Sequence, residues 1–501
     1  MQETYILFTK RINPYLFLFL LSIFLYVPSS FLREPFYPDE ARNIFITNNI
    51  KNLKDYFFPK YLEGIYFEKP PFYFWLLKIF FKIKIFNYLV LPVLFNSIVS
   101  WAIASLNYSF LKKENAQHIG FLSSIFLITS GLFYGMNILV RMDILFLFFI
   151  ILIIFLFFEY LEKRKIILFF LSSFFSFLAV FTKGAFGIIF PFFIEFIFGF
   201  ILKDKKVFLK VILNNLLSLL LISFWLFSFS KIEPHYFQNL FFYKTLMRAV
   251  GAQSHKAPIY YYLIYILWVF LPWSFFILGY ILNFKKTKLY LWEKIYLIWF
   301  LGGFIILSLI ESKLVIYLLL ISVPFFSFLA KFICEAQYRL KKNLLFFIFG
   351  FFVISWIIAF FYFKYKKEHT PLSSYGVIIL LLITFFFIIK RPFPLMFRNF
   401  FVSWLILIQM INFLFLPLVS ENMDFKKISK ILLNINRDFD KIYIKEKSLF
   451  LLSVYSSFNK PLIYLEEKET PTPPFLLITK EELTLEKISK IGDFYIFYKN
   501  K

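Results

Sequence analysis

Six short stretches of the sequence gather acids, bases and aromatic residues inside otherwise apolar surroundings. Lysine and arginine on rigid elements bind phosphate, lysine as a point charge and arginine as a bidentate fork. A nearby carboxylate deprotonates or orients an acceptor hydroxyl, and cations stabilise the negative charge of a departing phosphate. This combination therefore fits attack on a phosphate-linked sugar. The stretches are residues 37–42 (YPDEAR), 66–71 (YFEKPP), 141–143 (RMD) and 182–184 (TKG), then Arg248, and then 311–317 (ESKLVIY).

The elements that carry these stretches are apolar runs of about twenty residues, the length at which a helix crosses a bilayer. The chain has 501 residues, of which 60% are hydrophobic and 24% aromatic, a composition that excludes an ordinary soluble domain. We therefore predict an all-α polytopic membrane protein. No small-residue cleavage site follows the first run, which predicts a retained helix rather than a signal peptide. We predict thirteen spans, at residues 12–32, 87–111, 119–138, 141–158, 165–182, 184–202, 207–229, 258–283, 290–310, 314–333, 343–363, 372–389 and 398–418.

The net charge of +25 is consistent with a membrane protein, because lysine and arginine accumulate in cytoplasmic loops. With the N-terminus inside, every short inside loop is basic, and the basic residues at 364–367 are the exception that falls outside. All six stretches then lie on the outside face, so we expect one polar site near that interface. The inside basic residues are Lys10, Arg11, Lys112, Lys113, Lys163, Arg164, Lys165, Lys203, Lys205, Lys206, Lys285, Lys286, Lys288, Arg339, Lys341, Lys342, Lys390 and Arg391.

Two outside loops are long, at residues 33–86 and 230–257, and loops of this length are often functional. The first contains two stretches, 41–53 and 70–85, with the mixed composition of interfacial helices. After residue 420 the sequence becomes charged, with short apolar runs separated by prolines. We predict a membrane domain at 1–419 and a small α/β soluble domain, placed outside, at 420–501.

The chain has one cysteine, Cys334, so no intrachain disulfide is possible.

The stretches at residues 37–42, 66–71, 141–143 and 182–184, and Ser312 and Lys313 with Tyr317, resemble the motifs of the GT-C glycosyltransferases, in particular the ArnT-like aminoarabinose lipid A transferases and the related protein O-mannosyltransferases. The similarity also includes residues 255–262 (HKAPIYYY) and 270–273 (FLPW), and it covers about residues 35 to 320 in the order of the family. The resemblance implies the GT-C fold and transfer of a sugar from a polyprenyl-phosphate donor, such as an undecaprenyl one, outside the inner membrane. The implied acceptor is lipid A or a protein, and nucleic acid is not an implied partner.

The resemblance also implies roles for individual residues. Asp39 matches the catalytic carboxylate of the family, and Arg42, Lys69 and Arg248 match positions that hold the carrier phosphate. Other cavity residues needed for activity are matched by Glu68, Asp143, Lys183 and Tyr317. We therefore predict a catalytic set of Asp39, Glu68, Asp143 and Lys183, and a substrate-binding set of Arg42, Tyr66, Lys69, Arg248, Lys313 and Tyr317.

The chain departs from the family in the second long loop, where lipid A transferases often carry histidines. The chain has Phe241, Phe242, Tyr243 and Lys244 at those positions, with His235 and His255 nearby. This departure argues against a bound divalent metal, and no other cofactor is indicated. No metal-binding spacing of cysteine and histidine and no Walker loop is found.

Several residues also have a plain structural interpretation. Asp39 and Glu40 are favourable at the start of a helix. Glu68 with Lys69, and Arg141 with Asp143, fit local ion pairs. Lys183 and Lys313 fit lysines that reach the headgroups, and Arg248 fits a solvated loop. Two other functions remain open, a membrane transporter and a non-catalytic scaffold. Transporter charges typically lie near the bilayer midplane in repeated, broken helices, and no repeat is visible in this sequence.

Overall fold

The computed structural model describes most of the chain, and the following sections concern those residues. They are 11–36, 38–61, 64–83, 87–238, 240, 255–282, 289–337, 339–348, 350, 393–421, 424–434, 441–445, 452, 462–464, 475–480, 486–491 and 494–499.

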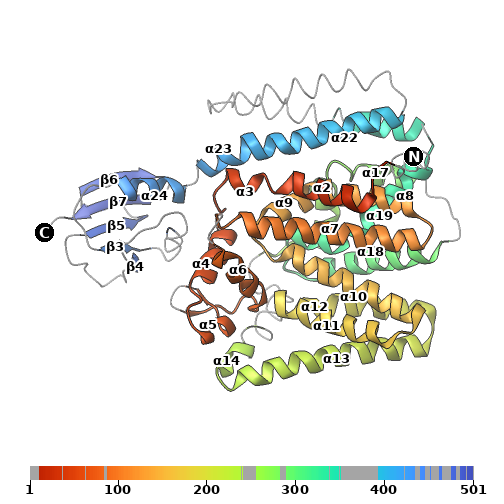
Figure 1. Ribbon diagram of the computed structural model, residues 1–501, viewed down its shortest axis with the longest axis horizontal. Helices are drawn as coiled ribbons and strands as arrows, with labels where there is room; N and C mark the ends of the chain where they lie inside the picture. The colour runs from red at the N-terminus through yellow and green to blue at the C-terminus, as the bar shows by residue number, and fades with distance from the viewer. Residues whose placement is uncertain are drawn as a thin grey trace.

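Long apolar helices form a bundle that is the main body of the molecule (Figure 1). In the described part of the chain, eight helical segments are long and apolar enough to cross a membrane. They confirm a polytopic membrane fold. The segments are Pro14–Leu32 (α2, Pro14–Tyr26, and α3, Ser29–Leu32), Val90–Lys113 (α7), Asp143–Lys163 (α10), Ile166–Lys183 (α11), Lys205–Phe229 (within α13, Lys205–Ser230), Leu291–Leu309 (α18), Val315–Glu335 (η2, Val315–Ile321, and α19, Ser322–Glu335) and Phe393–Phe415 (α22, Phe393–Met410, and η3, Ile411–Phe415).

Three predicted spans differ from the simple expectation. The span at 119–138 is a pair, α8 (Gln117–Thr129) and α9 (Gly131–Ile138), bent by 58°. The span at 184–202 is a shorter helix, α12 (Phe186–Leu202). The span at 258–283 is two short helices, α16 (Tyr261–Val269) and α17 (Phe276–Leu282), because Pro272 between them lacks the N–H that a continuous helix needs. The predicted span at 372–389 and most of that at 343–363 lie outside the described residues.

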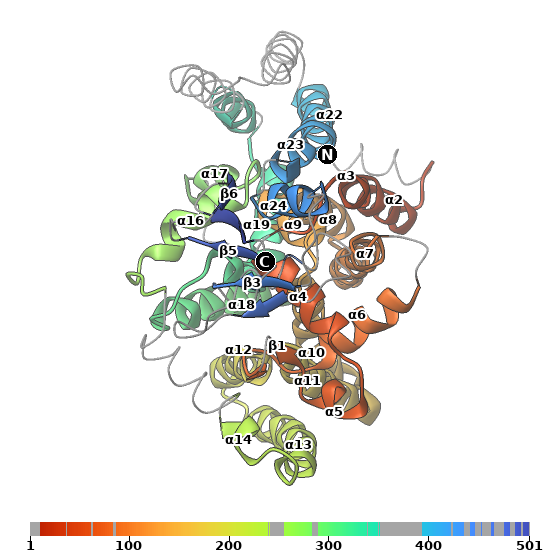
Figure 2. The same cartoon turned by 90° about the vertical axis from the view of Figure 1, so that its left-hand side faces the viewer.

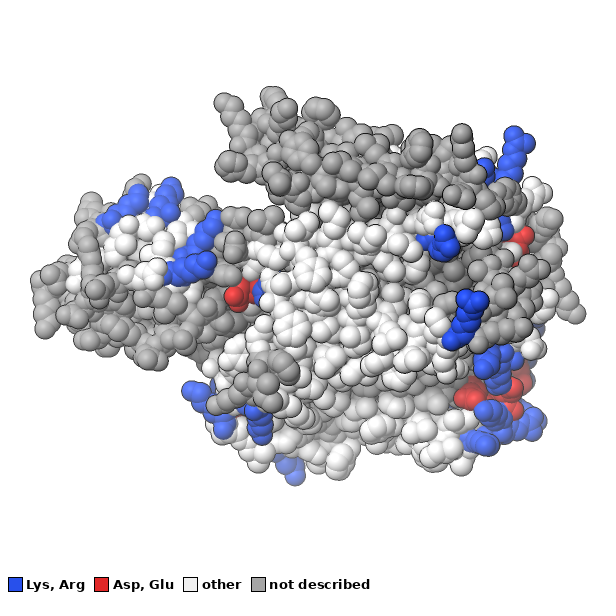
Figure 3. All heavy atoms as spheres, turned by 45° about the horizontal axis from the view of Figure 1, so that its top comes forward, with Lys and Arg blue, Asp and Glu red and all other residues white. Residues whose placement is uncertain are grey.

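Charged residues lie toward the two ends of the bundle, with a broad uncharged band between them on the face that Figure 3 shows. A continuous buried apolar core joins the helices, and it includes Leu25 of α2, Ile103 of α7, Ile150 of α10 and Trp299 of α18. Residues Lys113 and Lys163, which we predicted to lie inside, are at the C-terminal ends of their helices. The following helices begin at that end, so it is opposite to the end where Asp143 and Lys183 lie.

The first long loop folds onto this second end of the bundle. It contains α4 (Asp39–Asn48), α5 (Leu53–Phe57), a two-stranded hairpin of β1 (Lys60–Tyr61) and β2 (Gly64–Ile65), and α6 (Phe72–Lys82). Two helices, α4 and α6, correspond to the two interfacial stretches that the sequence predicts. A short α14 (Pro234–Phe237) begins the second long loop.

Residues after α23 (Leu416–Glu421) form α24 (Asp424–Asn434) and a five-stranded sheet. The strands are β3 (Lys441–Ile444), β4 (Leu462–Tyr464), β5 (Phe475–Thr479), β6 (Glu486–Ile491) and β7 (Phe494–Lys499), in the order β4-β3-β5-β7-β6. Strand β3 pairs parallel with β4 and β5, and the other pairs are antiparallel. The sheet has its own apolar core with α24, and it lies at the end of the bundle that carries α4 and α6 (Figures 1 and 2).

Candidate active site

Six charged side chains form a continuous series of ion pairs at this end of the bundle. Arg42 pairs with Glu68 (3.7 Å) and with Asp39 (2.5 Å), and Asp39 also pairs with Arg141. Nε of Arg141 lies 3.0 Å from Asp143, which also pairs with Lys183. We call the series the ion-pair chain; its members are Glu68, Arg42, Asp39, Arg141, Asp143 and Lys183. Acids and bases alternate along it, so each charge has an opposite charge beside it.

The members come from four elements whose ends meet. Helix α4 begins at Asp39 and carries Arg42 one turn later, α10 begins at Asp143, and α11 ends at Lys183. Glu68 lies in the turn that precedes α6. Among the three acids, side-chain exposure falls from 39% for Glu68 and 33% for Asp39 to 3% for Asp143, and Lys183 beyond Asp143 is 14% exposed. The series therefore leads from an accessible end into the protein.

Two adjoining cavities flank the ion-pair chain. The smaller, of about 70 Å³, is polar and is lined by Asp39, Arg42, Asn43, Tyr66, Lys69, Arg141, Asp143, Lys183 and Tyr317, among others. The larger, of about 270 Å³, has mainly apolar walls that include Phe146, Phe186, Ile189 and Ile306. Lys69, Lys183 and Tyr317 line both. The pair of cavities suits a molecule with a polar group joined to an apolar tail.

Aromatic rings lie beside the cations of the site. The Lys183 ammonium is 5.4 Å from the ring centre of Tyr317 and 5.1 Å from that of Phe146. The Arg42 guanidinium is 5.9 Å from the ring of Tyr66, whose hydroxyl donates to Glu68 at 3.4 Å. Attraction between a cation and a ring face adds to the positioning of both groups. The Lys183 side chain therefore contacts Asp143 and the rings of Phe146 and Tyr317, and does not extend to the lipid headgroups.

The two arginines of the ion-pair chain stay charged. Burial lowers the pKa of Arg141, but Asp143 and Asp39 beside it raise that pKa above its ordinary value. Burial likewise lowers the pKa of Arg42, and Tyr66, Glu68 and Asp39 outweigh this and raise it. Both guanidinium groups are therefore permanent hydrogen-bond donors in the site.

The predicted residue Lys313 is not among the described residues that line these two cavities. Lys313 is buried, its ammonium donates to the carbonyl of Ile310, and burial lowers its pKa. Its backbone N–H donates to the carbonyl of His255 at 3.0 Å, which ties the end of the second long loop to the segment before η2. Arg248 lies outside the described residues, and no position is assigned to it.

Arg141 is the site residue that the predicted set leaves out. Its spacing of two from Asp143 suggests a local ion pair, and that pair exists. The same guanidinium also reaches Asp39, which is 102 positions earlier in the sequence. The signal available in the sequence was the RMD stretch itself, a charge pair at the start of an apolar run.

Among the described residues, no three histidine, cysteine or acidic side chains gather in a way that would hold a metal ion.

Comparison with known proteins places this geometry in a family context. No family model matches the chain. It is 28% identical over 331 residues to an undecaprenyl phosphate-alpha-4-amino-4-deoxy-L-arabinose arabinosyl transferase of Wigglesworthia glossinidia brevipalpis. It is 25% identical over 319 residues to arabinosyl transferase 2, of the same name, from Proteus mirabilis (strain HI4320). These alignments cover 62% and 61% of the chain, and 57% of each transferase. An uncharacterized protein of Aquifex aeolicus (strain VF5) is 27% identical over 346 residues, which are 68% of the chain and 66% of that protein.

The crystal structure of ArnT from Cupriavidus metallidurans bound to undecaprenyl phosphate superimposes on the chain with a TM-score of 0.74. The match covers 96% of this chain and 97% of that one, at 12% identity. The chain is thus similar to ArnT and shares its fold, the GT-C fold. The predicted resemblance and fold class are thus confirmed. The ArnT-like match extends beyond the six motifs to nearly the whole chain, so it includes the helices that position the ion-pair chain.

Proposed function

We propose that this ArnT-like protein is a glycosyltransferase that takes its sugar from a polyprenyl-phosphate donor. The observation that carries the proposal is the ion-pair chain, which lies between a small polar cavity and a larger apolar one. A phosphate near Lys69 and Lys183, which line both cavities, would have its prenyl tail on the apolar side and its sugar on the polar side. The names of the related transferases and the fold support the same donor class.

The reaction exchanges one bond at the anomeric carbon of the sugar. An acceptor oxygen forms a new bond to this carbon as the bond from the carbon to the phosphate oxygen breaks. The electron pair of the broken bond leaves with the polyprenyl phosphate, whose added negative charge is stabilised by Arg42, Lys69 and Lys183. When the acceptor is a hydroxyl, Asp39 orients it and takes its proton; when the acceptor is an anionic phosphate, no proton has to be removed, and Asp39 balances the positive charge that develops at the anomeric carbon. Asp39 fits this role because it is the more accessible of the two acids that contact Arg141.

The sugar and the acceptor are proposed from the relatives. We propose 4-amino-4-deoxy-L-arabinose as the sugar and lipid A as the acceptor, at the periplasmic face of the inner membrane. The alternative within the same chemistry is a mannosyl transfer to protein hydroxyls. A transporter is not favoured, because the described charges of the site gather at helix ends on one side of the bundle.

The test compares Asp39→Asn with wild-type protein in membranes supplied with an undecaprenyl-phosphate sugar. Loss of the carboxylate should reduce transfer by about 100-fold or more, within the usual range for a positioned acid–base group. Glu162→Gln is the matched control, since Glu162 pairs with Lys113 at the opposite end of the bundle. Mass spectrometry of lipid A and of envelope glycoproteins, with and without the gene, identifies the acceptor. Normal transfer by Asp39→Asn would contradict the assignment of the carboxylate, and solute flux without a donor would favour the transporter.

A further inference from the structure

A second charged pair, Arg33 with Glu40, lies behind the site and is almost fully buried. Their side chains are 0% and 2% exposed, and the two guanidinium nitrogens lie 2.7 and 2.8 Å from the two carboxylate oxygens. A buried ion pair usually adds little net stability compared with apolar residues of the same size, because both charges lose their hydration. Its geometry therefore calls for a role other than stability alone.

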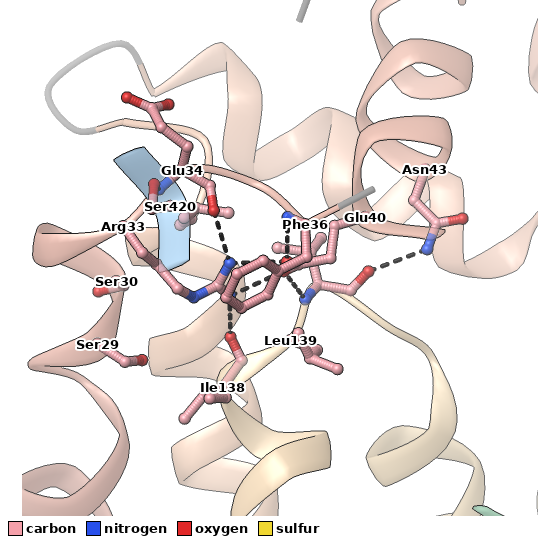
Figure 4. Close-up of polar contacts among 12 residues, drawn as sticks. Ser29, Ser30, Arg33, Glu34, Phe36, Glu40, Asn43, Ile138, Leu139 and Ser420 are labelled. Carbon is pink, nitrogen blue, oxygen red and sulfur yellow. Dashed lines mark hydrogen bonds and ion pairs between the residues drawn. The ribbon is translucent and has the colours of Figure 1, made fainter. Parts of the chain in front are cut away.

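Glu40 joins the start of α4 to two other parts of the chain, residues 33–36 and Val140. One oxygen accepts from Arg33 and from the N–H of Val140 (2.7 Å), and the other accepts from Arg33 and from the N–H of Phe36 (2.7 Å). Arg33 also donates to the carbonyls of Ile138 and Glu34. Figure 4 shows Arg33 and Glu40 at the centre of these contacts. The carboxylate thus accepts four hydrogen bonds, two from the Arg33 guanidinium and two from backbone N–H groups.

The segment that Glu40 holds is the one that carries Arg141. Two side chains of α4 form hydrogen bonds with the backbone of Val140. Its N–H donates to Glu40, and its carbonyl accepts from Asn43 at 2.9 Å. Asn96 of α7 donates to the carbonyls of Asn137 and Leu139 and fixes the same segment from the other side. Arg141 follows Val140 directly, and Asp39 precedes Glu40 directly. The pair of contacts at Val140 therefore sets the separation of Asp39 and Arg141.

We infer that Arg33 and Glu40 are positioning residues for sugar transfer, acting through Val140 to hold Arg141 against Asp39. Neither is among the residues lining the two cavities, so the effect reaches the substrate only through the ion-pair chain. This inference rests on the proposed function for its kinetic consequence. Its structural part, the restraint of residues 137–141 by Glu40, can be measured without any substrate.

The first experiment measures transfer kinetics of Glu40→Gln, which keeps the shape of the side chain and one acceptor oxygen. Misplacement of catalytic groups by a fraction of an ångström should lower kcat by about tenfold or more, with the donor KM within about threefold of wild type. The matched control is Glu293→Gln. Glu293 is equally buried and also binds a lysine, Lys331, and a backbone N–H, that of Tyr290, but its α18 end lies away from the site. Equal loss of kcat in both variants at equal thermal stability would overturn the inference.

A double-mutant cycle with Arg141→Lys separates positioning from a general folding defect. If Glu40 acts through Arg141, the two substitutions together should lower kcat by less than the product of their separate effects. Independent effects that multiply would overturn the inference while leaving the proposed function intact.

Hydrogen–deuterium exchange tests the restraint directly, in detergent and without a donor. Glu40→Gln should speed exchange in the peptide that contains residues 137–141 relative to wild type, and Glu293→Gln should not. Unchanged exchange in Glu40→Gln would overturn the inference even if the enzyme proved to catalyse another reaction. Should Glu40→Gln fail to accumulate, Arg33→Lys serves in the same measurement, because it keeps the charge and loses the bidentate contact.

Discussion

Asp143 is the most buried carboxylate of the ion-pair chain, and two cations depend on it. It accepts from Arg141 and Lys183 and begins α10, where a negative charge also suits the helix dipole. Asp39 shares Arg141 but remains partly exposed. We therefore propose different roles for the two acids: Asp143 fixes the positions of the two cations, and the more exposed Asp39 meets the substrate.

We predict that Asp143→Asn destabilises the protein as well as reducing its activity. Removing one partner of a buried ion pair leaves the other charge without compensation and costs about 3–5 kcal/mol. Thermal unfolding in detergent measures the change. Lys113→Gln, in the more exposed pair with Glu162, should cost no more than about 1 kcal/mol. Equal effects of the two substitutions would show that burial of Asp143 does not strengthen its interactions.

At the residue scale, the sequence predicts which charged residues lie together better than it predicts the individual contacts between them. Asp39, Asp143 and Lys183 are conspicuous because ionisable residues interrupt apolar runs, and they lie together in the structure. Arg141 was outside the predicted set because a pair two residues apart gives no sign of a second partner far along the chain. The contacts of Glu40 were missed for the same reason, since its partners Arg33 and Val140 become neighbours only after the helices pack.

At the scale of elements, the first long loop is ordered by caps as well as by apolar packing. Asn52 caps α5, and Asp55 accepts from the N–H groups of Lys51 and Asn52 and pairs with Lys60 at 3.0 Å. Burial raises the pKa of Asp55, but these hydrogen bonds and Lys60 outweigh it and leave the pKa below its ordinary value of 3.8. The carboxylate therefore stabilises the start of the hairpin that precedes Tyr66.

The depressed pKa of Asp55 predicts a specific dependence on pH. Its contribution to stability is fully present above the unfolded-state value of 3.8 and is lost as the pH falls through the lower folded-state value. Thermal unfolding followed from pH 7 down to about pH 2 should show this loss in wild type, mainly below about pH 4. Asp55→Asn should be less stable at neutral pH and should lack that part of the acid-dependent change. An identical pH dependence in the variant would contradict the assignment.

Long apolar runs predict correctly that a segment is helical, but they do not predict whether the helix is continuous or broken. Hydrophobicity shows that residues 258–283 are buried in apolar surroundings, but it does not show whether the helix is unbroken. Pro272 was the available warning of the break between α16 and α17. The bend between α8 and α9 has no proline, and Ser130 at the bend is fully buried with its hydroxyl bonded to the carbonyl of Leu127. Such a bend follows from packing that a single sequence does not display.

At the scale of the whole molecule, the basic helix ends and the ion-pair chain lie at opposite ends of the bundle. We propose that residues 1–419 form the membrane domain and that 420–501 form a periplasmic domain beside the site. Among the described residues, the N–H of Glu34 donates to the hydroxyl of Ser420 at 2.8 Å, near the proposed boundary between the two domains. This bond joins the end of the last described membrane helix to the segment that carries Arg33.

The proposed orientation predicts the outcome of cysteine labelling. Cys334 is the single native cysteine, so Cys334→Ala gives a background free of thiols. In this background Lys54→Cys should react with a membrane-impermeant maleimide in intact spheroplasts, and Lys113→Cys should not. Both should react with a permeant maleimide, since both lysines are partly exposed. Labelling of position 113 alone by the impermeant reagent would reverse the orientation and remove the periplasmic site.

The balance of charge in the ion-pair chain has a consequence for the order of events. Three acids and three bases cancel, so an arriving phosphate meets guanidinium groups that already have carboxylate partners. To take over the hydrogen bonds that these carboxylates now accept, it must displace an acid, as one counter-ion replaces another. The more exposed acids, Asp39 and Glu68, are the ones that give way, because Asp143 is enclosed. We propose that donor docking thereby releases Asp39 from its resting contacts, so that the carboxylate becomes available only when there is a sugar to transfer.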